Sequence, residues 1–162
     1  MKRAVPAPGQ ESVWDYPRPP RVESEARRVT IVFNGSLIVD SARALRVLET
    51  SHPPNIYVPL DDVAVGVLSP NPQQTVCEWK GQANYWDVRV GDEISAAAAW
   101  GYRTPRAGFE ALVDHASFYP GRMEACYLGD ELVVPQAGSF YGGWITNDVV
   151  GPFKGGAGSW GW

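Results

Sequence analysis

Three side chains that could take part in acid–base or charge-based chemistry are Glu49, His52 and Lys80. Glu49 and His52 are three positions apart, and Pro53-Pro54 follows at once, which restricts the His52 backbone to an extended or polyproline conformation. A carboxylate and an imidazole on such a stiff corner can face one pocket, where either could act as a general base. A plainer interpretation pairs Glu49 with Arg46 and leaves His52 in solvent.

Lys80 lies in the densest aromatic stretch of the chain, Cys77–Asp87, which holds two Trp, one Tyr, one Cys and one Lys. The pattern predicts two short strands, Thr75–Trp79 and Asn84–Val90, joined by a turn. Lys80 would then stand at that turn beside a core, where an ammonium could anchor an anionic or carbonyl group. Alternatively, it is a structural cation over the ring of Trp79.

Large aromatic side chains recur along the chain and could wall a pocket around these polar groups. Ligand pockets are mostly apolar, with a few placed polar groups. The same aromatic residues also fit an ordinary hydrophobic core, and their spacing does not separate the two interpretations. The residues that we expect to contact a ligand are Tyr57, Trp79, Trp100, Tyr102 and Tyr119.

Composition points to strands and turns. The chain has 162 residues, of which 20% are charged, and it contains 17 Gly and 14 Pro. That size fits one domain, and the many turn-forming residues are atypical of a helical bundle. We predict a mainly β fold, α+β at most: a small antiparallel two-sheet structure or half-open barrel with one or two short helices.

The chain divides by composition into three parts. Residues 1–28 form a Pro-rich N-terminal arm, since five prolines there exclude a helix or a central strand over most of it. The segment Val13–Tyr16 either folds back onto the domain or belongs to a disordered tail. Residues 29–136 form a single β-rich domain. Residues 137–162 form a Gly/Trp-rich extension, and its aromatic residues predict that it packs on the domain.

Within the domain, Asn34-Gly35 between two β-rich runs predicts a hairpin of Val29–Phe33 with Ser36–Val39, because a type I′ turn needs positive φ at both central residues. Asp40-Ser41 then offers an N-cap for a short helix over Ala42–Glu49. Further along we expect a loop at Ser69–Gln74 and two strands, at Ile94–Tyr102 and His115–Tyr119.

Net charge, the lack of long apolar runs and the low cysteine content argue against several classes of protein. A net charge of −4 argues against a nucleic-acid partner, which would need clustered Lys and Arg. No run approaches the roughly 18 apolar residues of a membrane span, and no secretory leader opens the chain, so we expect a cytoplasmic protein without a membrane partner. Cys77 and Cys126 are too few for a structural zinc site. We therefore expect no metal and no other cofactor, and leave a disulfide open.

Four stretches carry a resemblance to a known family: Val47–Pro54, Cys77–Trp86, Ala99–Tyr102 and Ala116–Pro120. In order and spacing they resemble a bacterial family known as domain of unknown function 427, sometimes labelled nucleotidyltransferase-like. The resemblance covers about residues 29–136. It implies a small antiparallel β fold similar to the β-tent folds, whose better-known members hold zinc through paired cysteines. This chain lacks those pairs, so no zinc is carried over.

The nucleotidyltransferase label finds no support in the residues. Nucleotidyl transfer needs carboxylates that hold magnesium and a loop that cradles phosphates. The chain has no Gly-Lys-Ser/Thr loop, and its only Asp-Asp pair is Asp61-Asp62, whose side chains would point apart in a strand.

Two functions stay open. The first is a small-molecule-binding domain, with a catalytic version in which His52 or Glu49 is the general base and Lys80 the anchor. The alternative is a non-enzymatic protein-interaction or homodimerisation module that uses the aromatic arms. The expected partners are accordingly an unknown small molecule or a second copy, with the chain a monomer or a homodimer.

Overall fold

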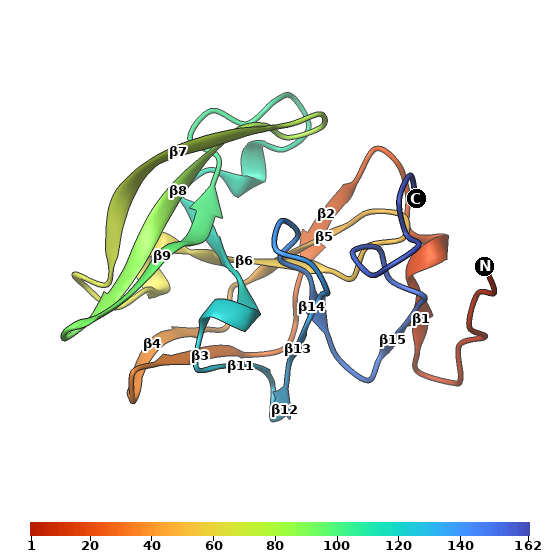
Figure 1. The fold of residues 1–162 in the computed structure, drawn as a ribbon, viewed down its shortest axis with the longest axis horizontal. Helices are drawn as coiled ribbons and strands as arrows, with labels where there is room; N and C mark the ends of the chain where they lie inside the picture. The colour runs from red at the N-terminus through yellow and green to blue at the C-terminus, as the bar shows by residue number, and fades with distance from the viewer.

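The computed structural model describes residues 1–162 and consists of strands and short 3-10 turns, with no α-helix (Figure 1). The strands form four sheets, two of them large, and none of the sheets closes into a barrel. The prediction of a mainly β, largely antiparallel fold is confirmed. No helix is present that has the length and hydropathy needed to cross a bilayer.

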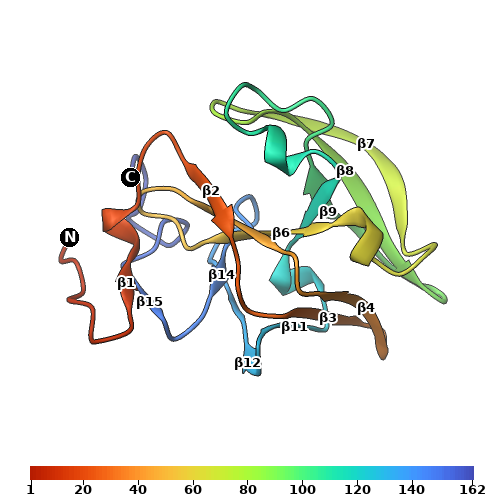
Figure 2. The same cartoon turned by 180° about the vertical axis from the view of Figure 1, so that it is seen from behind.

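The larger sheet has seven strands, all antiparallel to their neighbours (Figures 1 and 2). Its spatial order brings together segments that are far apart in the sequence. From one edge to the other the strands are β2 (Arg21–Ser24), β5 (Leu45–Leu48), β6 (Asn55–Pro59), β10 (His115–Phe118), β9 (Glu93–Gly101), β8 (Gly81–Val90) and β7 (Leu68–Cys77).

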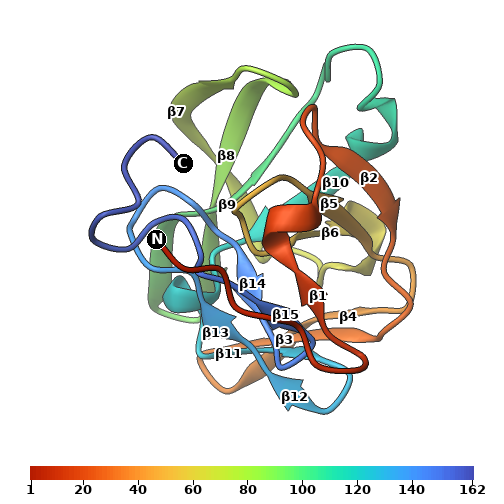
Figure 3. The same cartoon turned by 90° about the vertical axis from the view of Figure 1, so that its right-hand side faces the viewer.

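The second sheet has four strands, in the order β12 (Glu131–Leu132), β11 (Ala125–Leu128), β3 (Val29–Phe33) and β4 (Ser36–Ser41). In Figure 3, β3, β4 and β11 lie along the lower side of the molecule, and β7 and β8 lie along the upper side. The β3–β4 turn has φ of 46° at Asn34 and 74° at Gly35, as the predicted type I′ hairpin requires.

The main hydrophobic core is built by side chains of both large sheets. It contains Ile31 from β3, Val39 from β4 and Phe118 from β10, all almost fully buried. Because side chains alternate along a strand, Ile56 and Val58 of β6 enter this core, whereas the residue between them belongs to another cluster. The seven-stranded sheet thus has the core on one face and a second aromatic cluster on the other.

Two small sheets connect the ends of the chain to this body. β1 (Glu11–Ser12) pairs in parallel with β15 (Val149–Val150), and β13 (Val134–Pro135) pairs with β14 (Trp144–Ile145). A third buried cluster joins Val13, Tyr16, Leu48 and Val149. Short 3-10 turns occur at η1 (Val13–Asp15), η2 (Leu60–Asp62), η3 (Glu110–Leu112) and η4 (Pro120–Arg122).

Strand β2 lies within the segment 1–28, so the seven-stranded sheet begins inside the part that the sequence set apart as an arm. An ion-pair network reinforces this edge. The guanidinium of Arg46 on β5 lies 3.1 Å from a carboxylate oxygen of Glu11, and its Nε donates to Glu23 on β2 at 2.7 Å. Charge-assisted hydrogen bonds of this kind hold β1, β2 and β5 together.

The helix predicted over Ala42–Glu49 is wrong, because Leu45–Leu48 of this segment form strand β5 between β2 and β6. Over so short a run, its apolar residues fit the spacing of a helix as well as that of a strand. In the structure Leu45 and Val47 face the aromatic cluster, whereas Leu48 faces the opposite side. Pairing with two distant strands therefore decided the conformation.

The loop predicted over Ser69–Gln74 is also wrong, because these residues belong to β7. Pro70 and Pro72 argued for a loop, since proline cannot donate a backbone hydrogen bond. β7 is an edge strand, however, where a proline is tolerated, and its pairing with β8 shifts register between Asn71 and Gln74. The predicted strands at Ile94–Tyr102 and His115–Tyr119 correspond to β9 and β10. Cys77 and Cys126 are both free thiols.

Candidate functional site

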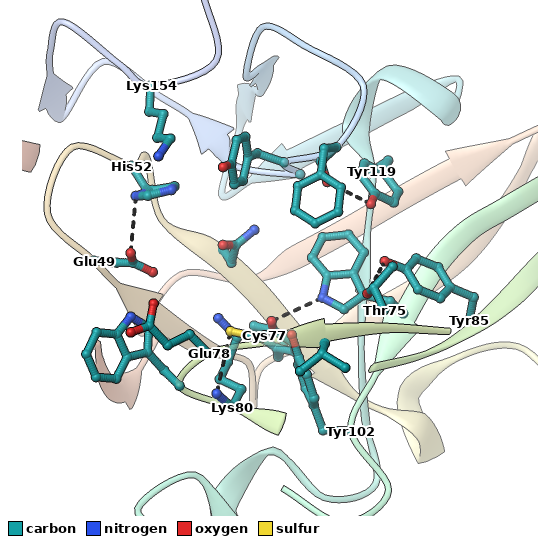
Figure 4. A pocket seen from close by; sticks show the side chains of 18 residues that line it. Glu49, His52, Thr75, Cys77, Glu78, Lys80, Tyr85, Tyr102, Tyr119 and Lys154 are labelled. Atoms are coloured by element: carbon teal, nitrogen blue, oxygen red, sulfur yellow. Dashed lines mark hydrogen bonds and ion pairs between the residues drawn. The ribbon is translucent and has the colours of Figure 1, made fainter. Parts of the chain in front are cut away.

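A cavity of about 280 Å³ lies on the aromatic face of the seven-stranded sheet (Figure 4). The residues that line it come from the β5–β6 connection and β6, the β7–β8 hairpin, the ends of β9 and β10 and the C-terminal segment. All eight site residues predicted from the sequence are among them: Glu49, His52, Tyr57, Trp79, Lys80, Trp100, Tyr102 and Tyr119. The structure thus brings the set together, while the role of each residue stays a prediction.

Two aromatic residues two strands apart, Tyr57 and Trp100, form the floor of the cavity. Both Tyr57 on β6 and Trp100 on β9 pair in register with Ser117 of the intervening β10, so their side chains are aligned across the sheet. The indole Nε1–H of Trp100 donates to the Tyr57 hydroxyl at 3.2 Å, and the rings meet edge to face. Each is almost completely buried.

A second group of contacts holds the Trp100 ring in place at one side of the cavity. The Tyr119 hydroxyl donates to the carbonyl of Phe140 at 2.9 Å, and its ring lies 4.6 Å from that of Trp100. The guanidinium of Arg122 covers the Tyr119 ring at 4.2 Å. Gly142 approaches so closely that a Cβ would collide with Trp100. The C-terminal segment therefore packs against Trp100 and Tyr119 from outside the sheet.

Lys80 stands in the turn between β7 and β8, and only 7% of it is exposed. Its backbone is held on both sides, since its N–H donates to Cys77 Sγ at 3.5 Å and its carbonyl accepts from Arg106 at 2.9 Å. The ring nearest to its ammonium in a cation–π arrangement is Tyr102, at 5.9 Å, and not Trp79 as the sequence allowed. The side chain thus belongs to the cavity and not to the surface.

No ion pair involves Lys80. Burial by itself lowers the pKa of a lysine, but the negative charges that Tyr57, Cys77 and Glu49 carry when they are ionised outweigh it, so the pKa of Lys80 lies above its ordinary value. Lys80 is thus buried, has a raised pKa and has no carboxylate oxygen within 4.0 Å of its side-chain nitrogen.

The corner that carries Glu49 and His52 follows β5 and depends on both ends of the chain. Ser51, fully buried, adopts a left-handed φ of 72°, which is costly for a non-glycine residue. Its N–H donates to Val13 at 3.0 Å, and its carbonyl accepts from the N–H of Lys154 at 2.8 Å. The N-terminal segment and the C-terminal segment together hold His52 at the cavity.

His52 has a defined tautomer. Its Nδ1 lies 3.0 Å from the Thr50 carbonyl, which can only accept, so Nδ1 carries the proton and Nε2 keeps a lone pair. Burial lowers the pKa of His52, and the charges of Lys154 and Arg18 act in the same direction against the opposing effect of Glu49. The imidazole is therefore neutral at neutral pH, with Nε2 available as an acceptor.

Glu49 and His52 are neighbours without a mutual hydrogen bond. The distance from His52 Nδ1 to Glu49 Oε2 is 3.8 Å, whereas the same carboxylate oxygen accepts from Arg18 Nε at 3.2 Å. The predicted pairing of Glu49 with Arg46 does not occur, because Arg46 is taken by Glu11 and Glu23. Glu49 is thus committed to Arg18 as a counter-ion, and His52 is the freer candidate base.

Sequence reasoning missed several lining residues. Lys154, Phe140 and Tyr141 belong to the C-terminal extension, and the ring of Tyr141 meets His52 edge to face at 5.1 Å. The aromatic residues of that extension were the available signal, since they predicted that it packs on the domain. Asn55 and Cys77 also line the cavity. No cluster of three or more His, Cys, Asp or Glu side chains in the structure could hold a metal ion.

Comparison with protein families places the chain in a known family. The model of the family described as Domain of unknown function (DUF427) matches residues 21–129, about two thirds of the sequence, and the chain belongs to this family. The match begins at the first residue of β2 and excludes the lining residues 140–142 and 154. No curated protein matches the sequence.

Proposed function

We propose that this member of the DUF427 family binds a small organic molecule in the cavity of the seven-stranded sheet. One observation carries the proposal: a charged, buried side chain, Lys80, lines an aromatic-walled cavity and has no counter-ion in the protein. A side chain of this kind is costly to the fold, and cavities of this composition are typical of ligand sites.

The size of the cavity limits the ligand. A volume of about 280 Å³ corresponds to roughly nine water molecules at about 30 Å³ each. It lies at the lower end of the usual range for ligand pockets, which begins near 300 Å³. The part of the proposed ligand that lies inside the cavity is therefore about one ring with a few substituents.

The cavity also contains one group that could move a proton. With Nδ1–H donating to Thr50, the Nε2 lone pair of His52 is free to accept a proton or a hydrogen bond from a ligand. In a catalytic version of the proposal, His52 is the general base, and Glu49 stabilises the imidazolium from 3.8 Å. Lys80 would then hold the charge that develops on the substrate.

Native mass spectrometry tests the proposal directly. The purified protein should carry a non-covalent adduct that disappears on denaturation, or should acquire one when a library of small one-ring compounds is added. Alkylation of Cys77, which lines the cavity, should slow when that compound is bound, whereas Cys126 in the core provides the internal comparison. A bare protein that binds no member of the library would contradict the proposal.

The alternative, an interaction module built on the aromatic arms, has less support. Trp14 lies edge to face with Trp162, and its Nε1–H donates to the carbonyl of Pro152, so the two ends of the chain use these aromatics on each other. Trp160, 99% exposed, is the clearest remaining candidate for a contact. Deleting residues 1–28 would remove β2 from the sheet, so Trp160→Ala with size-exclusion chromatography is the cleaner test of assembly.

A further inference from the structure

Three hydrogen-bond donors gather at the floor of the cavity, from the turn after β7, from β6 and from the end of β9. They are the Lys80 ammonium and the hydroxyls of Tyr57 and Tyr102, all on residues less than a tenth exposed. An ammonium can only donate, and burial raises the pKa of both tyrosines, so both keep their protons at neutral pH. The floor is therefore rich in donors.

The protein supplies few of the matching acceptors: Cys77 is a side-chain hydrogen-bond partner of Lys80, but no carboxylate is. The oxygen of Tyr57 already accepts from Trp100. If one of the two hydroxyls donates to the other, the proton of the second is still free to donate into the cavity. No carboxylate oxygen lies within 4.0 Å of Lys80 Nζ. A buried positive charge with an unused hydroxyl proton beside it is the pattern of a site that lacks its anion.

The two acidic residues on the lining do not fill this role. Glu49 is paired with Arg18, and Glu78 is exposed at the rim. The opposite side of the cavity, where Figure 4 shows His52 and Lys154, is different in character. There, the Lys154 ammonium donates to the Trp162 carbonyl at 2.9 Å, and His52 presents an acceptor. Both lysines therefore favour negative charge in the cavity, and Lys80, which has no carbonyl partner of this kind, is the one free to hold an anion.

We infer that the ligand is a small aromatic monoanion, a carboxylic acid in its ionised form, whose oxygens lie against Lys80, Tyr57 and Tyr102. This inference rests on the proposed function and names its ligand class. A carboxylate has two oxygens that accept several hydrogen bonds, which suits one ammonium and neutral hydroxyls. A phosphate is less well matched, because its sites usually combine several cations or backbone N–H groups. The aromatic walls favour a planar ring.

Three probes of nearly the same shape separate charge from shape: benzoate, benzamide and benzamidinium, with charges of −1, 0 and +1. Each is titrated into the protein near pH 7, with binding followed by calorimetry and by the fluorescence of the cavity tryptophans. Benzoate should bind at least about tenfold more tightly than benzamide, and benzamidinium should show no binding. The variant Lys80→Met should lower the affinity for benzoate to that for benzamide, whereas the matched variant Lys2→Met, exposed near the start of the chain, should behave as the wild type.

The variant Tyr102→Phe keeps the ring and removes one donor, so it should weaken benzoate binding several-fold and leave benzamide nearly unchanged. If Lys80→Met does not fold, Tyr102→Phe still tests whether the donors at the floor bind the carboxylate. Equal affinities for benzoate and benzamide, or benzoate binding that survives Lys80→Met, would overturn the inference and leave the proposed cavity function standing. If none of the three probes binds, the inference is wrong, and the native mass spectrum then decides whether the proposed function falls with it.

Discussion

Trp144 offers the sharpest test of how the C-terminal segment contributes to the fold. The sequence places it in an extension, but it is 1% exposed and belongs to the main core. Its backbone N–H donates to Pro54, and its indole Nε1–H donates to the Phe118 carbonyl at 3.0 Å. Trp144→Ala should therefore destabilise the whole domain, and not only loosen the end of the chain.

The expected magnitude follows from these contacts. Removing a fully buried Trp side chain costs about 3–5 kcal/mol, and losing the hydrogen bond to Phe118 adds on the order of 1 kcal/mol. For a domain of this size, each kcal/mol lowers Tm by about 2–4 °C, so Trp144→Ala should lower Tm by roughly 10–20 °C. The backbone bond to Pro54 is unaffected by the substitution.

Urea unfolding followed by circular dichroism would measure this effect, with a thermal melt in parallel. The matched control is Trp160→Ala, in the same segment and 99% exposed, which should stay within about 0.5 kcal/mol of the wild type. If Trp144→Ala shifts the midpoint no more than Trp160→Ala does, the reasoning is refuted, because the segment would then be a removable extension and not part of the core.

Two further predictions concern the site. Because burial lowers the pKa of His52, the unfolded chain binds more protons than the native state below about pH 6.5, so stability should fall as the pH drops from about 7.5 to 5.5. Urea unfolding of His52→Gln over this range should show a weaker pH dependence than the wild type, and an unchanged dependence would contradict the assignment. Gly142→Ala places a methyl group against the Trp100 ring, so it should cost about 1–3 kcal/mol in urea unfolding and weaken benzoate binding. Gly156→Ala, with open space around it, should do neither, and equal effects of the two substitutions would refute the steric argument.

Features encoded by local chemistry were predictable from the sequence. The Asn34-Gly35 turn is one, because few residues other than Asn and Gly accept positive φ at two successive positions, and the turn fixes the β3–β4 pairing. The hairpin of β7 and β8 is another, since two β-rich runs flank a short turn. Segments whose apolar residues fit both the period of a helix and the period of a strand were not predictable. Strand β5 is the clear case, since only its two neighbouring strands make it extended.

The residues of the candidate site were recognisable one by one, because aromatic and ionisable side chains stand out in a sequence of this composition. Their convergence was not, since Tyr57 and Trp100 are 43 positions apart and meet only through the intervening strand β10. The state of each polar group was equally hidden. Arg18 forms an ion pair with Glu49, the Thr50 carbonyl sets the tautomer of His52, and no acidic side chain pairs with Lys80.

The amino-acid sequence by itself determined a mainly β domain, its tightest turns and a set of side chains fit for a polar, aromatic pocket. These follow from the φ preferences of single residues, from the period of two along a strand and from side-chain chemistry, all of which act over a few positions. Only the tertiary structure decided that the two ends of the chain meet at the His52 corner and hold it, and that Lys80 is buried without a counter-ion. Those outcomes depend on sheet order and on packing between distant segments, where non-local contacts override local preference.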